Sequence, residues 1–135
     1  MLRKTSDGPS LVVCNTCRHS ADARDDGEGV RGGARLLVHL SVLAADDPRL
    51  HGFVIVQMPC LFICKSHCSV HLRAPGKVGY VLGHFEPTAA AAQAILDYAA
   101  HYVESAHGSV AYRLWPEGVK GHFIVRTPPH GMAVE

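Results

Sequence analysis

Two close-spaced cysteine pairs constrain this chain more than any other feature of its sequence. They are Cys14-x-x-Cys17 and Cys60-x-x-x-Cys64, and a short apolar run precedes each pair. Runs of this length, rich in β-branched residues, are typical of β-strands. We therefore expect both pairs of thiols to leave the ends of strands.

The segment between the pairs predicts how these two strands meet. Residues 11–13 and 53–57 are the apolar runs, and leucines at helical spacing predict a helix over residues 34–45. A strand–helix–strand crossover makes its two strands parallel, and we expect them to be neighbours. The almost uniformly apolar run 53–57 further predicts a central strand that is buried on both faces. Both cysteine pairs should then emerge at one edge of the sheet.

The chain after the second pair predicts a hairpin and a long helix. Residues 69–72 and 78–82 are short strand-like runs, and Ala74-Pro75-Gly76 between them has the composition of a turn. An alanine-rich helix is expected over residues 87–105, with Pro87 in its first turn. The predicted fold class is α/β, with a four-stranded mixed sheet and two main helices.

Residues 1–135 form one predicted domain, because 135 residues with 47% hydrophobic and 19% charged side chains can bury a single core. We expect that core over residues 10–106, followed by an irregular tail, 107–135. Trp115 and residues 123–125 are the expected docking points of this tail.

Charge and hydropathy exclude several classes of partner. The formal net charge is +1, without a basic stripe, which argues against nucleic acid. No apolar run approaches the roughly 20 residues that span a bilayer, and the start lacks the pattern of a signal peptide. We therefore expect a cytoplasmic protein with no membrane partner. In a reducing compartment five cysteines indicate metal binding or thiol chemistry rather than disulfides.

Four thiolates suit either an iron–sulfur cluster or zinc. The predicted ligands are Cys14, Cys17, Cys60 and Cys64, with Cys68 as an alternative fourth ligand. The three-residue spacing of the second pair and its longer irregular segment favour a cluster over the tight knuckles of zinc sites.

Other polar residues flank the cysteines. Arg18 and Lys65 adjoin them and would stabilise a negatively charged cluster. The nearby histidines, which could also ligate metal, are His19, His67 and His71.

Three motifs follow one another in the second half of the chain: Cys60-Leu61-x-x-Cys64, Val70-x-Leu72 and Gly76-Lys77-x-x-Tyr80. They resemble the second half of thioredoxin-like [2Fe–2S] ferredoxins, the group that includes the small [2Fe–2S] subunit of respiratory complex I. The resemblance spans roughly residues 11–103 and implies a thioredoxin-like fold of the ferredoxin type with a [2Fe–2S] cofactor. Cys14 and Cys17 are closer together than the first two cysteines of such ferredoxins.

Four motifs are spread over the whole chain: Cys14-x-x-Cys17-Arg18, Cys60-Leu61-x-x-Cys64-Lys65, Ala74-Pro75-Gly76-Lys77 and Arg126-x-Pro128-Pro129. With them the chain resembles an uncharacterised bacterial family of predicted metal-binding proteins, domain of unknown function sixteen thirty-six. Genes of that family tend to lie near genes for cobalamin synthesis and cobalt handling, which implies a partner pathway.

Three functions remain open from the sequence. The first is a [2Fe–2S] electron carrier or accessory protein, and the second is a zinc- or cobalt-binding or trafficking module linked to cobalamin synthesis. The third is a thiol–disulfide oxidoreductase, which the sequence disfavours because the predicted helix starts too far after Cys17 for its dipole to activate Cys14. A non-enzymatic role with a redox or metal-handling protein partner is favoured, and a homodimer is left open.

Overall fold

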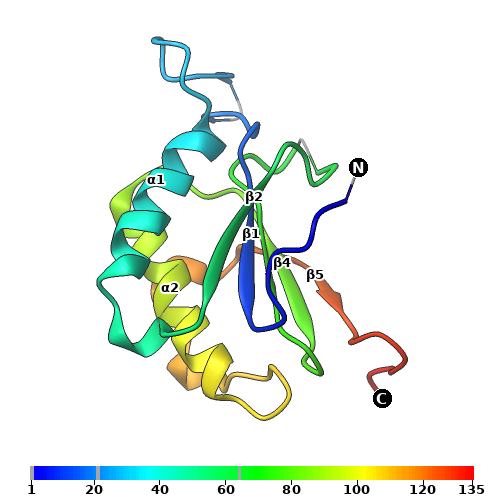
Figure 1. Ribbon diagram of the computed structural model, residues 1–135. Helices are drawn as coiled ribbons and strands as arrows, with labels where there is room; N and C mark the ends of the chain where they lie inside the picture. Colours follow the sequence, from blue (N-terminus) through cyan, green and yellow to red (C-terminus); the bar gives the residue numbers. More distant parts are fainter. Residues whose placement is uncertain (1, 21, 64) are drawn as a thin grey trace.

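The chain folds into a five-stranded mixed sheet with both long helices on one face (Figure 1). The computed structural model describes residues 2–20, 22–63 and 65–135, so the predicted ligand Cys64 lies outside the described residues. The strand order is β2-β1-β3-β4-β5. The strands are β1 (Ser10–Cys14), β2 (Val54–Met58), β3 (Val70–Arg73), β4 (Gly79–Leu82) and β5 (Phe123–Thr127).

β1 lies inside the sheet and every one of its residues is buried. It runs parallel to β2, with Cys14 opposite Met58, and antiparallel to β3. The prediction that both cysteine segments begin at the same edge of the sheet is therefore confirmed. The prediction of a central strand over 53–57 is wrong, because β2 is an edge strand and is only partly buried.

The two helices cover one face of the sheet. α1 (Gly32–Ala45) buries Leu36 and Leu40 completely and starts slightly before the predicted boundary. α2 (Ala89–Glu104) starts after Thr88, whose Oγ1 accepts a hydrogen bond from the Ala91 amide at 3.2 Å. A threonine in this position satisfies an amide that the helix itself leaves without a partner. Pro87 therefore precedes the helix cap and does not lie in the first turn.

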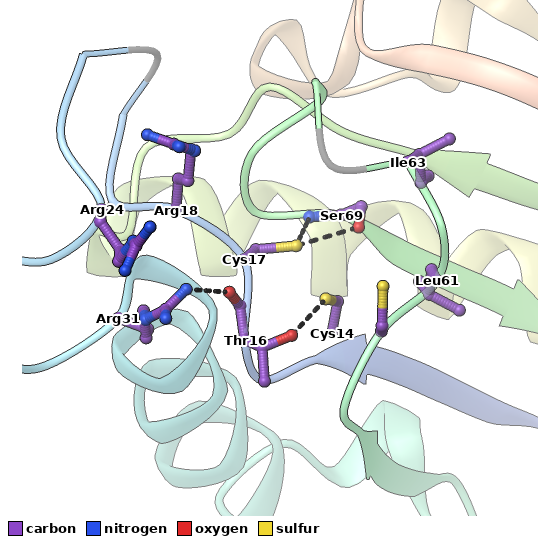
Figure 2. Close-up of a pocket in the computed structure, with 10 residues that line it drawn as sticks. Cys14, Thr16, Cys17, Arg18, Arg24, Arg31, Leu61, Ile63 and Ser69 are labelled. Atoms are coloured by element: carbon purple, nitrogen blue, oxygen red, sulfur yellow. Dashed lines mark hydrogen bonds between the residues drawn. The ribbon is translucent and has the colours of Figure 1, made fainter.

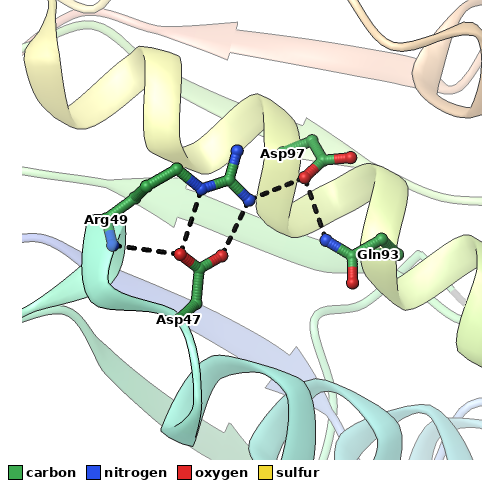
Figure 3. A network of polar contacts seen from close by, with 4 residues as sticks. All are labelled: Asp47, Arg49, Gln93 and Asp97. Atoms are coloured by element: carbon green, nitrogen blue, oxygen red, sulfur yellow. Dashed lines mark hydrogen bonds and ion pairs between the residues drawn. The ribbon is translucent and has the colours of Figure 1, made fainter.

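A polar network ties the turn after α1 to α2 (Figure 3). Arg49 lies in a short 3-10 turn (Pro48–Leu50), and its guanidinium binds both carboxylate oxygens of Asp47 at 3.0 and 2.7 Å. The same guanidinium contacts Asp97 of α2 at 2.7 Å, and Gln93 donates to Asp97 at 2.9 Å. This network fixes α2 against the end of the crossover that carries β1 into β2.

The C-terminal segment contains a fifth strand, so the prediction of a four-stranded sheet with an irregular tail is wrong. β5 pairs antiparallel with β4 and follows two short 3-10 turns, Tyr112–Leu114 and Glu117–Val119. Phe123 lies between Tyr98 and Trp115, with ring centroids 5.3 and 4.6 Å away. Aromatic packing therefore makes the tail part of the core. No helix within the described ranges is long and apolar enough to cross a membrane.

Replacing Phe123 tests whether β5 is part of the folded core. Phe123→Ala should lower the free energy of unfolding by about 3 kcal/mol, since it removes a large aromatic side chain from a packed cluster. Val125→Ala is the matched control in the same strand. Val125 is 44% exposed, so the change should stay within about 1 kcal/mol. Urea unfolding followed by circular dichroism measures both, and equal effects would contradict this role of β5.

Candidate functional site

A cavity of about 300 Å³ lies beside the end of β1, among the loops that carry the cysteines (Figure 2). Its lining comes from both predicted cysteine segments, although they are far apart in the sequence. The wall contains three cysteines (Cys14, Cys17, Cys60), three arginines (Arg18, Arg24, Arg31), and Thr16, Leu61, Ile63 and Ser69.

Hydrogen-bonding groups surround the sulfur atoms of the first pair. The Ser69 amide donates to Cys17 Sγ at 3.4 Å, and the Ser69 hydroxyl lies 3.2 Å from the same sulfur. Cys14 Sγ lies 3.7 Å from the hydroxyl of Thr16. Thiolates are strong acceptors of such bonds, so the two donors of Ser69 act to lower the pKa of Cys17.

The two thiols of the first pair titrate together. A hydrogen bond from Cys17 is the largest influence on Cys14 and lowers the pKa of Cys14 to about 5, with further help from Thr16. The same bond, together with burial, raises the pKa of Cys17 above its usual range. The pair therefore carries one negative charge at neutral pH, and Cys17 holds the shared proton.

The second cysteine segment approaches the same cavity from the end of β2. The Phe62 amide donates to Cys60 Sγ at 3.2 Å, and the backbone of Leu61 helps to lower the pKa of Cys14. The two loops are also tied directly, since the Asn15 amide donates to the Met58 carbonyl at 3.0 Å. Thiols of both segments thus face one space with backbone amides directed at their sulfur atoms.

The start of α1 packs directly on the first cysteine loop. The Gly33 amide donates to the Cys17 carbonyl at 3.2 Å. A Cβ atom at Gly33 would overlap the Cys14 carbonyl oxygen, and one at Gly32 would overlap that of Arg18. The chain between Arg18 and Gly32 is therefore an excursion whose two ends meet. The sequence argument that α1 starts too far from Cys14 is wrong, because distance along the chain is not distance in space.

Cys68 lies apart from the cavity. It is completely buried, its Sγ is 3.5 Å from the Arg18 carbonyl, and burial raises the pKa of its thiol to about 12. Cys17, by contrast, lines the cavity wall. The geometry thus brings Cys17 to the site and keeps Cys68 behind the Arg18 backbone.

Three arginines line the cavity without a carboxylate partner. Arg31 donates to the Thr16 carbonyl at 3.0 Å, and among the described residues none of Arg18, Arg24 and Arg31 forms an ion pair. Figure 2 shows all three on one side of Cys14 and Cys17. Sequence reasoning found Arg18 but missed the other two, which lie in a polar stretch without periodicity. Lys65 is exposed and does not line the cavity.

The predicted histidines do not line the cavity. His71 lies on β3, and the Nδ1 atoms of His19 and His67 are buried with no hydrogen-bond partner among the described residues. Within residues 2–20, 22–63 and 65–135, no three cysteine, histidine or acidic side chains form a group that could hold a single metal ion as they stand. Because Cys64 lies outside those ranges, the complete predicted ligand set is not described.

Comparisons with known proteins agree with the fold. The family model "Protein of unknown function (DUF1636)" matches residues 11–129. No curated protein matches the sequence. Among solved structures, a thioredoxin-like [2Fe–2S] ferredoxin from Aquifex aeolicus is similar, with a TM-score of 0.56 and 15% identity, over 95% of this chain and 100% of the ferredoxin. The predicted thioredoxin-like fold is therefore confirmed.

The contact between α1 and the cysteine loop predicts the effect of one methyl group. Gly33→Ala should lower the free energy of unfolding by about 3 kcal/mol, because backbone must move to admit the new Cβ. Gly8→Ala is the control, since a Cβ there meets nothing nearer than 3.7 Å and the change should stay within about 1 kcal/mol. Urea unfolding measures both, and a Gly33→Ala chain as stable as the parent would contradict the contact.

The shared proton predicts an unusual pH profile for alkylation of Cys14. Since the thiolate is the reactive form, iodoacetamide should modify Cys14 of the reduced, metal-free chain at half its plateau rate near pH 5. The rate should fall below that pH, as the sulfur becomes protonated, and stay level above it. Cys17→Ala removes the main cause and should move the midpoint up towards that of an ordinary thiol. Mass spectrometry follows the reaction, and an ordinary midpoint in the parent would refute the shared proton.

Proposed function

The chain belongs to the DUF1636 family, and we propose that it binds a [2Fe–2S] cluster and carries electrons. Cys14, Cys17, Cys60 and Cys64 are the proposed ligands. The observation that carries this proposal is that thiols from both cysteine segments line one cavity together with three arginines.

The donor set suits such a cluster. Its two irons take four thiolates in pairs, and this chain offers its cysteines as two close-spaced pairs. Cys14 already favours the ionised form that a ligand needs. Cys60 and Cys17 each accept a backbone amide hydrogen bond, from Phe62 and Ser69. Amide bonds to sulfur are among the features that set the potential of iron–sulfur proteins.

The charge around the cavity supports the same proposal. Four thiolates give a [2Fe–2S] centre a net negative charge, and three guanidiniums without carboxylate partners among the described residues lie beside the thiols. Each positive charge favours the thiolate over the thiol, and the set offsets the cost of gathering negative charge in a half-enclosed space.

The roles of the chain's own residues follow from these contacts. The bound cluster would supply one-electron transfer. Leu61 and Ile63 give the cavity an apolar wall that limits the access of water, and Arg31 fastens the first cysteine loop through the Thr16 carbonyl. The similar Aquifex aeolicus protein is described as a [2Fe–2S] ferredoxin, which gives this fold a precedent for the role.

A thiol–disulfide oxidoreductase is the second candidate, and a specific observation now favours it. Cys14 has a lowered pKa, Cys17 retains the proton, and the start of α1 packs on their loop. An attacking thiolate beside a protonated partner at a helix N-terminus is the arrangement that such chemistry needs. It leaves the second cysteine pair without a role, so the cluster remains the first proposal.

Four further interpretations of the sequence remain proposals. They are zinc or cobalt held by the same thiols, a link to cobalamin synthesis, a cytoplasmic location, and a non-enzymatic role beside a redox or metal-handling protein.

The spectrum of the purified protein tests the cluster. Protein prepared without oxygen should be red-brown, contain two irons per chain, and lose part of its visible absorption on reduction with dithionite. A colourless protein with stoichiometric zinc, or an iron-free coloured protein with stoichiometric cobalt, would refute the cluster in favour of a metal-binding module. A colourless, metal-free protein that reduces a disulfide substrate would favour the second candidate.

Two matched variants test the ligand set in the same experiment. Cys17→Ser should abolish or shift the visible spectrum, because Cys17 lines the cavity. Cys68→Ser should leave it unchanged, because Cys68 is buried behind the Arg18 carbonyl. Loss of the spectrum in Cys68→Ser alone would overturn the assignment of Cys17.

A further inference from the structure

We propose that the surface around the cavity docks a folded protein whose matching face has an apolar centre and a carboxylate rim. Phe62 is the apolar contact on this chain, and Arg18, Arg24 and Arg31 are its charged contacts. The inference that this partner is a redox protein rests on the proposed function. The inference that this surface binds a protein does not.

Phe62 is an exposed aromatic residue in the second cysteine segment. It lies between Leu61 and Ile63, which both line the cavity, yet Phe62 is itself 93% exposed. Its backbone has a φ of 61°, a region that bulky residues seldom adopt, and its amide donates to Cys60 Sγ. The backbone conformation that directs the Phe62 amide at Cys60 Sγ therefore leaves the Phe62 ring exposed to solvent. Aromatic side chains in such positions are frequent anchors of protein interfaces.

The three arginines form no ion pair with any other residue that the structure describes. Arg18 and Arg24 are exposed, and Arg31 is partly exposed. Neighbouring Arg35, in contrast, is paired with Asp26. Guanidiniums recognise carboxylates with directional hydrogen bonds, so a group of them without carboxylate partners among the described residues is suited to an acidic surface.

The excursion between Arg18 and Gly32 carries charges of both signs, which favours a protein partner over a nucleic acid or an anionic membrane. Asp22 and Glu28 are exposed within the same segment that carries the arginines. A nucleic acid or an anionic membrane presents negative charge everywhere and would be repelled by these carboxylates. A folded protein can place its own carboxylates opposite the arginines and leave the acidic positions uncontacted, or match them with cations.

Cytochrome c of two opposite charges provides the probe. Succinylated cytochrome c is acidic, whereas the native form has the same fold and is basic. Fluorescence anisotropy of the labelled full chain should show binding to the succinylated form that weakens at least tenfold between 20 mM and 500 mM salt, because salt screens exposed charges. The native form should bind at least tenfold more weakly at 20 mM salt.

Matched variants separate the docking surface from general charge. Arg24→Gln should weaken binding of the succinylated form about threefold, and Phe62→Ser about tenfold. Arg113→Gln and Met132→Ser remove an exposed arginine and a 60% exposed apolar residue elsewhere, and should change binding less than twofold. Circular dichroism confirms that each variant is folded.

The outcomes for the surface and for the cluster are distinguishable, because binding is measured on the protein as purified and after metal removal. Binding by a protein that is purified anaerobically without a cluster supports the surface while the proposed function fails. Equal binding of both cytochromes, or equal losses in the control variants, would overturn the surface. Tighter binding of a 20-nucleotide DNA strand or of anionic vesicles than of succinylated cytochrome c would overturn the choice of a protein partner.

Discussion

The parallel pairing of β1 with β2 is the constraint on which the rest of this structure depends. It aligns Cys14 with Met58, so the loops that follow both strands start side by side. A parallel pair requires a crossover, and α1 supplies it while burying Leu36 and Leu40 against the sheet. The core and the site therefore depend on the same helix. α1 covers the sheet, and it also connects β1 to β2, the strand that leads into the second cysteine segment.

The sequence predicted most of the architecture, for reasons that lie in local pattern. Apolar runs, leucine spacing and turn residues predicted four strands, two helices and the hairpin. They failed for β5, because its apolar run, residues 123–125, is short and its packing depends on contacts of Phe123 with Tyr98 of α2 and Tyr80 of β4. They also misplaced β2, because a continuous apolar run does not distinguish an edge strand from a central one.

The candidate site was predictable in composition but not in its surroundings. Spacing alone indicated the cysteines, and the crossover rule indicated their edge of the sheet. The arginines at positions 24 and 31 could not be found in this way, because the excursion that carries them has no periodicity. The hydrogen bond from Arg31 to the Thr16 carbonyl and the contact of Gly33 with the first cysteine loop bring that excursion back to the site. The same contact restored a thiol-redox candidate that distance along the chain had disfavoured.

Both ends of the excursion are fixed, so changes in its sequence are separate from changes in the framework that carries the cysteines. Since Arg18 and Gly32 are held against each other, the loop between Arg18 and Arg31 can change in length and charge without moving the sulfur atoms, whereas Arg31 itself holds the Thr16 carbonyl. Longer loops between fixed ends add little entropic cost. Related chains could therefore acquire new partners through this segment alone, while the sulfur-bearing framework beneath it stays as it is.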